Sequence, residues 1–270
     1  WQKGVKGGPF AFAIPADQGD RRRVAEMISL LLRHGIEVTQ AAAAFKVAEG
    51  EFTAGTYVVR LDQPYRNYAV DLLTPQAFPA DAAYEPYDDV SWSLPVHFGL
   101  DAKRIDDAKI MDVPLAPIQK DLQVQGNISG AGPVFLLKDT GQEVLLALRA
   151  RLAAFRIEIA EKSFKSGDKD FPAGSWILAD QKGLADALKR AAADLATDFE
   201  SAPALPDVPR HETKVPRLAV WHTWADTEAV GWIRYVFDRE KIPYKYIRYE
   251  DIRAGRLKDQ YDVIIFVDCY

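Results

Sequence analysis

The stretch Glu51–Val59, EFTAGTYVV, has a counterpart at Asp170–Leu178, DFPAGSWIL. Both stretches combine an acidic residue, a Phe, an Ala-Gly pair and a run of aromatic and aliphatic residues. Gly55 and Gly174 supply positions where a positive φ angle is cheap, and the residues that follow are typical of a strand. Neither copy contains an obvious nucleophile, base or metal ligand. The repeated stretch therefore predicts the same hairpin in two places, and it says more about architecture than about chemistry.

The segments before the two copies also share an order of features, which predicts two copies of one strand-helix-strand-hairpin module. In the first module they are the strand Phe10–Ile14, a helix ending near Gly35, the strand Ile36–Val38 and Phe45; in the second they are Pro133–Leu137, a helix carrying Val144 to Phe155, Ile157–Ile159 and Phe164. We place module one at residues 9–62, a connector at 63–132, and module two at 133–180 with a further helix to residue 197.

The remaining residues predict a linker and a third region. Residues 201–215 contain three prolines in SAPALPDVPRH, which favours a semi-rigid linker and a domain boundary. Beyond it, strands at 217–221, 244–247 and 261–267 alternate with helices. This alternation predicts an α/β fold with a doubly wound parallel sheet of flavodoxin-like type. With only these strands, residues 216–270 are expected to form an incomplete domain, and both chain ends suggest an internal piece of a longer polypeptide.

Composition excludes several classes of protein. A length of 270 residues suits about two domains. The formal net charge of −5 argues against a general nucleic-acid surface, and the basic run Arg21-Arg22-Arg23 is interpreted as a solvated helix face. No apolar run approaches the roughly 20 residues that span a bilayer. The single cysteine excludes an internal disulfide and a zinc site built from several thiolates.

Several motifs that resemble chemical sites are interpreted as structural. His34-Gly-Ile-Glu37 matches the H-x-x-E pair of zinc carboxypeptidases, but it falls at a helix-turn-strand junction without a third ligand. The acidic pairs Asp88-Asp89 and Asp106-Asp107 are interpreted as solvated surface. Gly126–Gly132 is rich in glycine, but it precedes a strand and lacks the helix N-terminus that cradles phosphate. No metal ligand or catalytic residue is assigned.

The best candidate site follows the first strand of the third region. In open α/β sheets, ligands bind beyond the carboxyl ends of the strands, where His222, Thr223 and Trp224 stand. These three residues are the candidate binding residues, while Asp226 is expected to cap the next helix. Cys269 ends the last strand without a visible group that would lower its pKa, so it is not assigned as a nucleophile.

Longer phrases carry a family resemblance. They are FAIPADQGD, TAGTYVVRLDQPYRNYAVDLL, YDDVSWSLPVHFGL, NISGAGPVFLLKDTGQE, RLAVWHTWADTEAVGWIRYVFDREKIPY and EDIRAGRLKDQYDVII. The chain resembles, over nearly its whole length, the region that follows the catalytic domain in large bacterial zinc carboxypeptidases of metallopeptidase family fourteen. The resemblance implies that residues 216–270 begin a segment similar to class I glutamine amidotransferases. Asp268-Cys-Tyr stands where amidotransferases place glycines, which argues against that activity.

The resemblance implies an accessory, non-catalytic region whose partner is an upstream carboxypeptidase-like domain of the same polypeptide. That domain would bind the zinc and hydrolyse peptide bonds, and no cofactor is expected in this chain. A secreted or periplasmic location is implied, with peptide as a possible substrate. Two alternatives stay open. One is a peptide- or glycan-binding module that uses aromatic residues such as Trp92, Trp221 and Trp224. The other is a hydrolase or transferase completed by residues beyond Tyr270.

Overall fold

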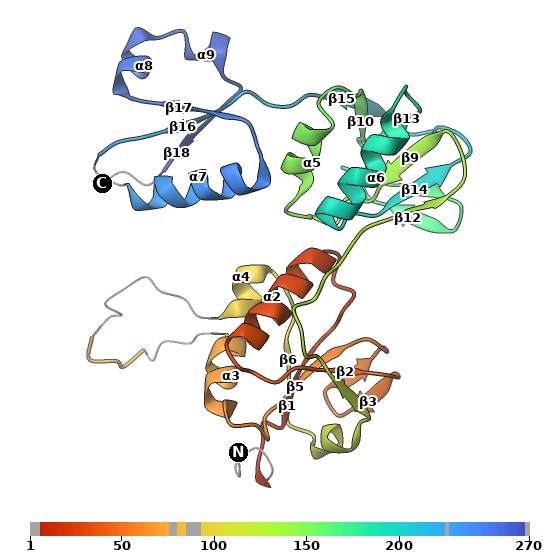
Figure 1. Ribbon diagram of the computed structural model, residues 1–270, viewed down its shortest axis with the longest axis vertical. Helices are drawn as coiled ribbons and strands as arrows, with labels where there is room; N and C mark the ends of the chain where they lie inside the picture. Colours follow the sequence, from red (N-terminus) through yellow and green to blue (C-terminus); the bar gives the residue numbers. More distant parts are fainter. Residues whose placement is uncertain (1–5, 76–79, 85–92, 225–226, 268–270) are drawn as a thin grey trace. The chain divides into compact units, whose positions relative to one another are not determined.

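The computed structural model describes residues 6–75, 80–84, 93–224 and 227–267 of the chain (Figure 1). The fold is mixed α/β and divides into two compact units, Trp1–Val124 (unit 1) and Gln125–Tyr270 (unit 2). This division falls inside the segment that the sequence analysis treats as a connector. The domain boundary expected at residues 201–215 is not where the compact units separate.

Unit 1 is built on a sheet whose neighbouring strands are all antiparallel. Among its described residues the sheet has five strands in the order β6-β1-β5-β2-β7. Its elements are β1 (Ala11–Ile14), α2 (Arg21–Arg33), β2 (Thr39–Ala41), β3 (Phe45–Val47), β4 (Gly50–Phe52), β5 (Tyr57–Arg60), α3 (Arg66–Leu73), α4 (Leu94–Phe98), β6 (Lys103–Ile105), the 3₁₀ helix η1 (Ala108–Asp112) and β7 (Leu115–Pro117). As expected for an N-cap, the Asp20 carboxylate accepts hydrogen bonds from the backbone N–H groups of Arg22 and Arg23, which starts α2.

Both faces of this sheet are covered, because alternate residues of a strand point to opposite sides. On one side Phe12 and Ile14 of β1 pack with the apolar stripe of α2, including Met27 and Leu31. On the other side Ala11 and Ala13 pack under the β3–β4 hairpin and η1. The helix thus supplies one layer and the hairpin supplies the other.

Unit 2 contains a second sheet of the same kind. Its described residues form the order β15-β10-β13-β9-β14-β8, in which only the β14–β8 pair is parallel. The elements are β8 (Ile128–Gly130), β9 (Val134–Leu137), α5 (Leu145–Arg151), β10 (Ile157–Ala160), β11 (Phe164–Ser166), β12 (Lys169–Phe171), β13 (Trp176–Ala179), α6 (Leu184–Leu195), β14 (Phe199–Ala202) and β15 (Arg210–Thr213). Helices α5 and α6 cover one face, and the β11–β12 hairpin covers the other.

The last part of unit 2 is a parallel sheet in the order β17-β16-β18 (Figure 1, blue). Its elements are β16 (Leu218–Trp221), α7 (Glu228–Glu240), β17 (Tyr244–Ile247), α8 (Tyr249–Ala254), α9 (Leu257–Gln260) and β18 (Val263–Phe266). Parallel pairing is what the alternation of strands and helices predicts. Helix α7 packs on one face through Val230 and Phe237, which meet Val220 and Tyr244.

The two antiparallel sheets share their central strands and their register. β5 lies between β1 and β2, and β13 lies between β9 and β10. The pairs Ile14↔Tyr57 and Thr39↔Val58 of unit 1 correspond to Leu137↔Trp176 and Glu158↔Ile177 of unit 2.

The hairpins agree in detail as well. Phe45 stacks on Phe52 with ring centroids 5.0 Å apart, and Phe164 stacks on Phe171 at 5.1 Å. Each Phe pair has a Lys–carboxylate ion pair beside it, Lys46–Glu51 in unit 1 and Lys165–Asp170 in unit 2.

Some sequence-based boundaries need correction. EFTAGTYVV does not form a hairpin by itself: it spans the end of β4, a turn at Gly55 with φ of 88°, and β5. The predicted strand Ile36–Val38 is buried at residues 36 and 38, but the ladder begins at Thr39. The Val38 carbonyl oxygen already accepts a hydrogen bond of 2.9 Å from the Ile118 N–H, so the predicted strand lies at the start of the pairing of β2.

The connector and the linker also belong to the sheets. Residues 63–132 contribute β6 and β7 to the first sheet, and the proline-rich residues 201–215 contain β15. β7 and β15 are edge strands, where proline and charge are tolerated because one side of the strand needs no backbone partner. The carbonyl oxygen of Thr213 accepts a hydrogen bond of 2.9 Å from Arg149 Nη2, which ties the end of β15 to α5.

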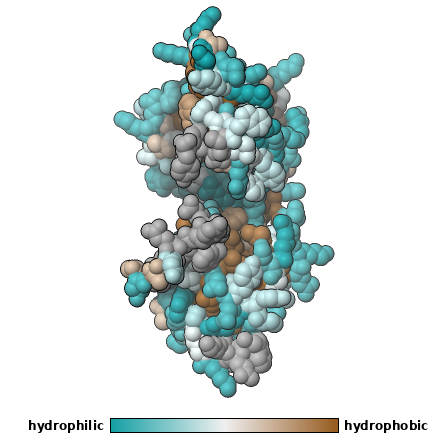
Figure 2. Space-filling model, turned by 90° about the vertical axis from the view of Figure 1, so that its left-hand side faces the viewer, coloured by the Kyte–Doolittle hydropathy of each residue, from teal (hydrophilic) through white to brown (hydrophobic). Residues whose placement is uncertain are grey.

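The surface is that of a charged protein, with hydrophilic side chains over most of the face shown in Figure 2. Exposed large aromatic residues are exceptions, and several of them lie in the region of the parallel sheet, where Trp224 is 82% exposed. No helix in the described ranges is both long and apolar enough to cross a bilayer.

Candidate binding site

The candidate site lies at the carboxyl end of β16, the central strand of the parallel sheet. α7 connects β16 to β17 on one side, and β18 then lies on the other side of β16. The chain connections therefore diverge at β16. Ligands of open parallel sheets bind beyond the carboxyl ends of the strands at such a divergence, which makes the residues after Trp221 the place to look for a site.

His222 is the buried centre of this site. It is 8% exposed, and its backbone N–H donates to the Ile247 carbonyl oxygen at 3.0 Å, so the β16–β17 ladder continues by one residue. Its ring lies 4.9 Å from the Tyr246 ring and 5.0 Å from the Trp224 ring, measured between centroids. Nδ1 is buried and has no hydrogen-bond partner among the residues that the structure describes. Burying a nitrogen without a hydrogen-bond partner costs about 1–3 kcal/mol of stability. A ligand that forms a hydrogen bond with Nδ1 would remove this cost.

Tyr246 is held in place by residues of α7. The Arg234 guanidinium carbon lies 4.7 Å from the centre of the Tyr246 ring, and Arg234 Nε lies 3.3 Å from the Tyr244 hydroxyl. That hydroxyl donates to Asp238 Oδ1 at 3.1 Å. The hydrogen bond to Tyr244 raises the pKa of Arg234. Residues of α7 and β17 thus fix the position of the Tyr246 ring that contacts His222.

The described side chains can contribute to binding. Within the described residues, His222 Nδ1 lacks the hydrogen-bonded carboxylate that orients a catalytic histidine. What remains is one hydrogen-bonding nitrogen between aromatic rings, with an exposed indole beside it. Such a site can hold a small group that offers one polar atom and a flat or apolar surface.

The three predicted site residues fall together, but they have different roles. His222 and Trp224 are in ring contact, and Thr223 between them is half-buried. Sequence reasoning missed Tyr246 and Arg234, because they come from the neighbouring strand and from α7. The alternation Tyr244-Lys-Tyr246 was the available signal, since both tyrosines must face the same side of β17.

The other predicted aromatic and capping residues are placed as follows. Trp221 is half-buried, with its ring 5.2 Å from the Phe266 ring and its Nε1 enclosed, so it is not the exposed contact residue that the binding alternative expects. Trp92, Asp226 and Cys269 lie outside the described residues.

The H-x-x-E pair does not converge on a metal position. His34 ends α2 and shares a hydrogen bond of 2.7 Å between its Nδ1 and the Tyr68 hydroxyl. The backbone N–H and carbonyl groups of Glu37 form hydrogen bonds with the Gln63 side chain. In the part of the chain that the structure describes, no group of three or more His, Cys, Asp or Glu side chains could hold a metal ion.

The acidic pair Asp106-Asp107 holds local structure. Asp106 pairs with Arg104 at 2.9 Å, and this hydrogen bond lowers the pKa of the carboxyl. Asp107 accepts hydrogen bonds from the backbone N–H groups of Lys109 and Ala48, which caps η1 and ties the β3–β4 hairpin to it; the Lys109 bond chiefly lowers its pKa. Asp88-Asp89 lies outside the described residues.

The glycines of Gly126–Gly132 allow close backbone approach. A Cβ atom at Gly126 would overlap the backbone of Thr197, one at Gly130 the carbonyl oxygen of Ser201, and one at Gly132 that of Ala202. These contacts follow the parallel pairing of β8 with β14. The glycine-rich stretch is therefore a packing feature of the second sheet.

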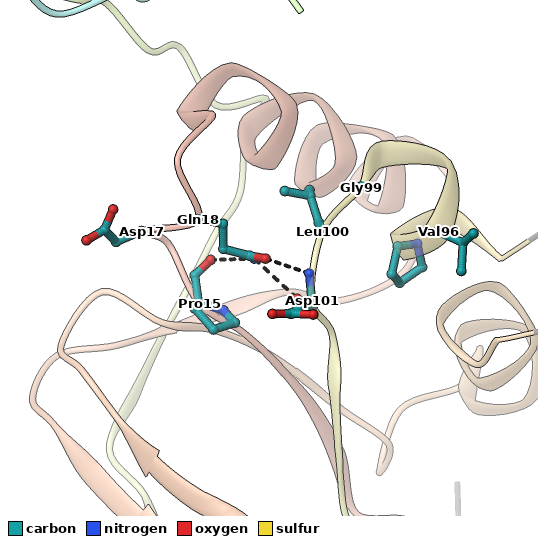
Figure 3. Close-up of a pocket in the computed structure, with 8 residues that line it drawn as sticks. Pro15, Asp17, Gln18, Val96, Gly99, Leu100 and Asp101 are labelled. Carbon is teal, nitrogen blue, oxygen red and sulfur yellow. Dashed lines mark hydrogen bonds between the residues drawn. The ribbon is translucent and has the colours of Figure 1, made fainter. Parts of the chain in front are cut away.

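A cavity of about 360 Å³ in unit 1 is a weaker candidate (Figure 3). It lies where β1 leads into α2, and Gln18 crosses it. The Gln18 amide nitrogen donates to the carbonyl oxygens of Pro15 and Asp101, while its oxygen accepts from the Asp101 N–H. The polar groups of Gln18 are therefore already engaged, and they serve to join the α4–β6 loop to the end of β1.

Comparison with known proteins gives no family for this chain. No protein-family model, curated protein or solved structure matches it.

Proposed function

We propose that the chain is an accessory α/β region of a zinc carboxypeptidase-like protein and that its parallel sheet binds a ligand at His222. The observation that carries the binding proposal is the buried Nδ1 of His222, which lies between Trp224 and Tyr246 and has no hydrogen-bond partner among the residues that the structure describes. The carboxypeptidase context rests on the sequence resemblance. In this proposal the upstream domain supplies the zinc and hydrolyses peptide bonds, while this region scaffolds that domain or presents substrate.

We also propose that the two antiparallel sheets are copies of one module and that the parallel sheet is of flavodoxin-like type. Support for the duplication comes from the shared register, the stacked Phe pairs and the shared edge strands β7 and β15. The copies then extend to residues 117 and 213, further than the repeated stretch alone suggests. Support for the flavodoxin-like type comes from the order β17-β16-β18.

The ligand that we favour is a peptide. Trp224 offers a flat surface, and Nδ1 offers one donor or acceptor of the kind that a backbone amide matches. Titration of the chain with a pool of tripeptides should quench tryptophan fluorescence and shift the His222 ring resonances. The fluorescence response should vanish in His222→Phe, and both responses should survive in His211→Phe, because the His211 imidazole is exposed and pairs with Glu161.

A β-1,4-linked trimer of N-acetylglucosamine forms the second arm of the titration. A response to the glycan alone would replace the peptide proposal by the glycan-binding alternative. Responses that persist in His222→Phe would place the ligand elsewhere and end the site proposal.

The parent activity needs its own test. The gene upstream of Trp1 should encode an H-x-x-E motif followed by a distant His. The full-length protein should then contain stoichiometric zinc and remove residues from the carboxyl ends of peptides. A signal peptide that leads directly into Trp1 would contradict the carboxypeptidase proposal without affecting the site at His222.

A further inference from the structure

The strand pairs β2–β7 and β10–β15 can be compared position by position, because the two sheets share their register. At equivalent register positions, unit 1 has Thr39 paired with Pro117 and Ala41 paired with Leu115. Unit 2 has Glu158 paired with Glu212 and Ala160 paired with Arg210. Unit 1 forms its sheet without these charges, so the fold does not require the charged residues of unit 2.

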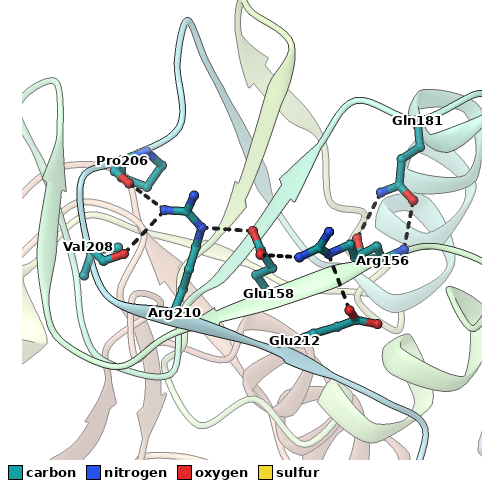
Figure 4. A network of polar contacts seen from close by, with 7 residues as sticks. All are labelled: Arg156, Glu158, Gln181, Pro206, Val208, Arg210 and Glu212. Atoms are coloured by element: carbon teal, nitrogen blue, oxygen red, sulfur yellow. Dashed lines mark hydrogen bonds and ion pairs between the residues drawn. The ribbon is translucent and has the colours of Figure 1, made fainter.

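Charged residues on β10 and β15 form a connected network with Arg156, which directly precedes β10 (Figure 4). Glu158 uses both carboxylate oxygens: Oε2 accepts from Arg210 Nε at 2.9 Å, and Oε1 accepts from Arg156 Nη2 at 3.0 Å. Arg210 is held further by the carbonyl oxygens of Pro206 and Val208. Glu158 thus fixes two guanidinium groups on the same side of the sheet.

A cavity of about 370 Å³ opens beside this network. Its charged lining consists of Arg156, Arg210 and Glu158, and Glu212 beside it forms an ion pair with Arg156, so two carboxylates stand beside the two guanidinium groups. Its apolar lining includes Ile177 and Leu205, and Leu205 is 43% exposed. The volume lies within the range of about 300–1,000 Å³ that is usual for small-molecule pockets.

Arg156 is the group best placed to meet a ligand. Its side chain is 65% exposed, and one terminal nitrogen bonds to Glu158. Arg156 Nε also forms an ion pair with Glu212 Oε2, and their separation of 3.5 Å is long for a hydrogen bond. Its backbone is nevertheless rigid, because the Gln181 amide bonds both its N–H and its carbonyl oxygen at 2.9 Å. A guanidinium on a fixed backbone suits recognition of a carboxylate.

We propose that this cavity binds a small organic carboxylate, such as the free carboxyl end of a peptide. Arg156 bonds the carboxylate, and the apolar part of the ligand covers Leu205 and Ile177. This inference goes beyond the site at His222, which lies on a different sheet, so either can fail without the other.

Two probes that differ in one group test the proposal. N-acetyl-leucine carries a carboxylate, whereas N-acetyl-leucinamide has the same shape without the charge. In NMR titrations of the full chain, the acid should shift resonances of Arg156, Ala179 and Leu205. The amide should bind about tenfold or more weakly, because hydrogen bonds to charged groups contribute about 1.5–3 kcal/mol.

Variants locate the interaction. Arg156→Gln should weaken binding of the acid to the level of the amide, and Arg156→Lys should give an intermediate affinity because it keeps the charge and loses the planar fork. Lys182→Gln removes a nearby exposed cation outside the cavity lining and should leave the affinity unchanged. Matching thermal melts for the variants would show that the fold is intact, as expected for exposed side chains.

Four outcomes would overturn the proposal, and the first three concern the affinity for N-acetyl-leucine itself. They are equal affinity for acid and amide, an unchanged affinity in Arg156→Gln, or no response to N-acetyl-leucine at millimolar concentration. An equal loss of affinity in Lys182→Gln and Arg156→Gln would also count against it, since it would indicate general charge attraction and not a site.

Discussion

Gln63 and Gln181 make the same connection in the two units. Gln63 Nε2 donates to the carbonyl oxygens of Glu37 and Arg60, and its Oε1 accepts from the Glu37 N–H. Gln181 repeats this pattern with Arg156 and Ala179. In each unit one amide therefore joins the segment before the second strand to the end of the central strand.

Removing either glutamine should destabilise its own unit. Gln63 is 2% exposed and Gln181 is half-buried, so we expect Gln63→Ala to lower the free energy of unfolding by about 2–3 kcal/mol and Gln181→Ala by about 1 kcal/mol. Hydrogen exchange measured on peptides from residues 30–65 and 150–185 would locate each effect. Gln260→Ala, at an exposed position, is the control. Equal protection in all variants would contradict the role of these amides.

Two glycine-to-alanine substitutions should change the free energy of unfolding in opposite directions. Gly132 has φ of 142° and no room for a Cβ atom beside Ala202, so Gly132→Ala should destabilise unit 2 by about 2 kcal/mol or more. Gly231 lies within α7 with open space around its Cα, so Gly231→Ala should stabilise by about 0.5–1 kcal/mol through the better helix propensity of alanine. Urea denaturation monitored by circular dichroism measures both. Destabilisation by Gly231→Ala would mean that α7 packs against something at this position.

Replacing His222 by Phe should separate stability from binding. Phe has a similar shape and removes a buried nitrogen for which the described residues offer no partner, so His222→Phe should leave stability unchanged or raise it by about 1 kcal/mol. Val220→Ala, two residues earlier and fully buried, should instead cost about 2 kcal/mol by creating a cavity. Thermal melts of the three proteins make the comparison. A strong loss of stability in His222→Phe would indicate that the imidazole is a satisfied part of the core.

The pair Arg217–Asp262 should contribute a distinct acid dependence. Hydrogen bonds from Arg217 lower the pKa of Asp262 from 3.8 to about 2. The unfolded chain then binds more protons than the folded chain between these values, so the contribution of this pair is complete above about pH 4 and is lost as the pH falls towards 2. Asp262→Asn should have a lower melting temperature at pH 7, and the difference from the parent protein should shrink between pH 4 and 2. A constant difference would contradict this assignment.

Much of the local structure could be predicted because it depends on short-range chemistry. The helix Leu184–Leu195 and the turns at Gly55 and Gly174 follow from residue type and spacing. An acidic cap before α2 is also predicted, but the sequence offers both Asp17 and Asp20, and the structure shows Asp20. The pairing of short strands could not be predicted in this way. β7 and β15 contain proline or charge, and only their position at a sheet edge makes them acceptable as strands.

The candidate sites also contain some residues that local sequence patterns identify and others that only tertiary contacts bring in. His222, Thr223 and Trp224 were found because they follow a predicted strand, whereas Tyr246 and Arg234 reach the site from elements that no sequence spacing relates to His222. The Arg156–Glu158–Arg210 network joins residues more than fifty positions apart, and it exists because β15 pairs with β10.

By itself the sequence determined the repeated EFTAGTYVV and DFPAGSWIL stretches and the parallel character of the last strands, and it predicts a candidate site in the residues after Trp221. Tertiary structure alone decided which strands are neighbours, where the two compact units separate, and which charges meet across the sheet. The physical reason is that turns, caps and periodicity are local properties of the chain, while register and burial depend on contacts between distant segments.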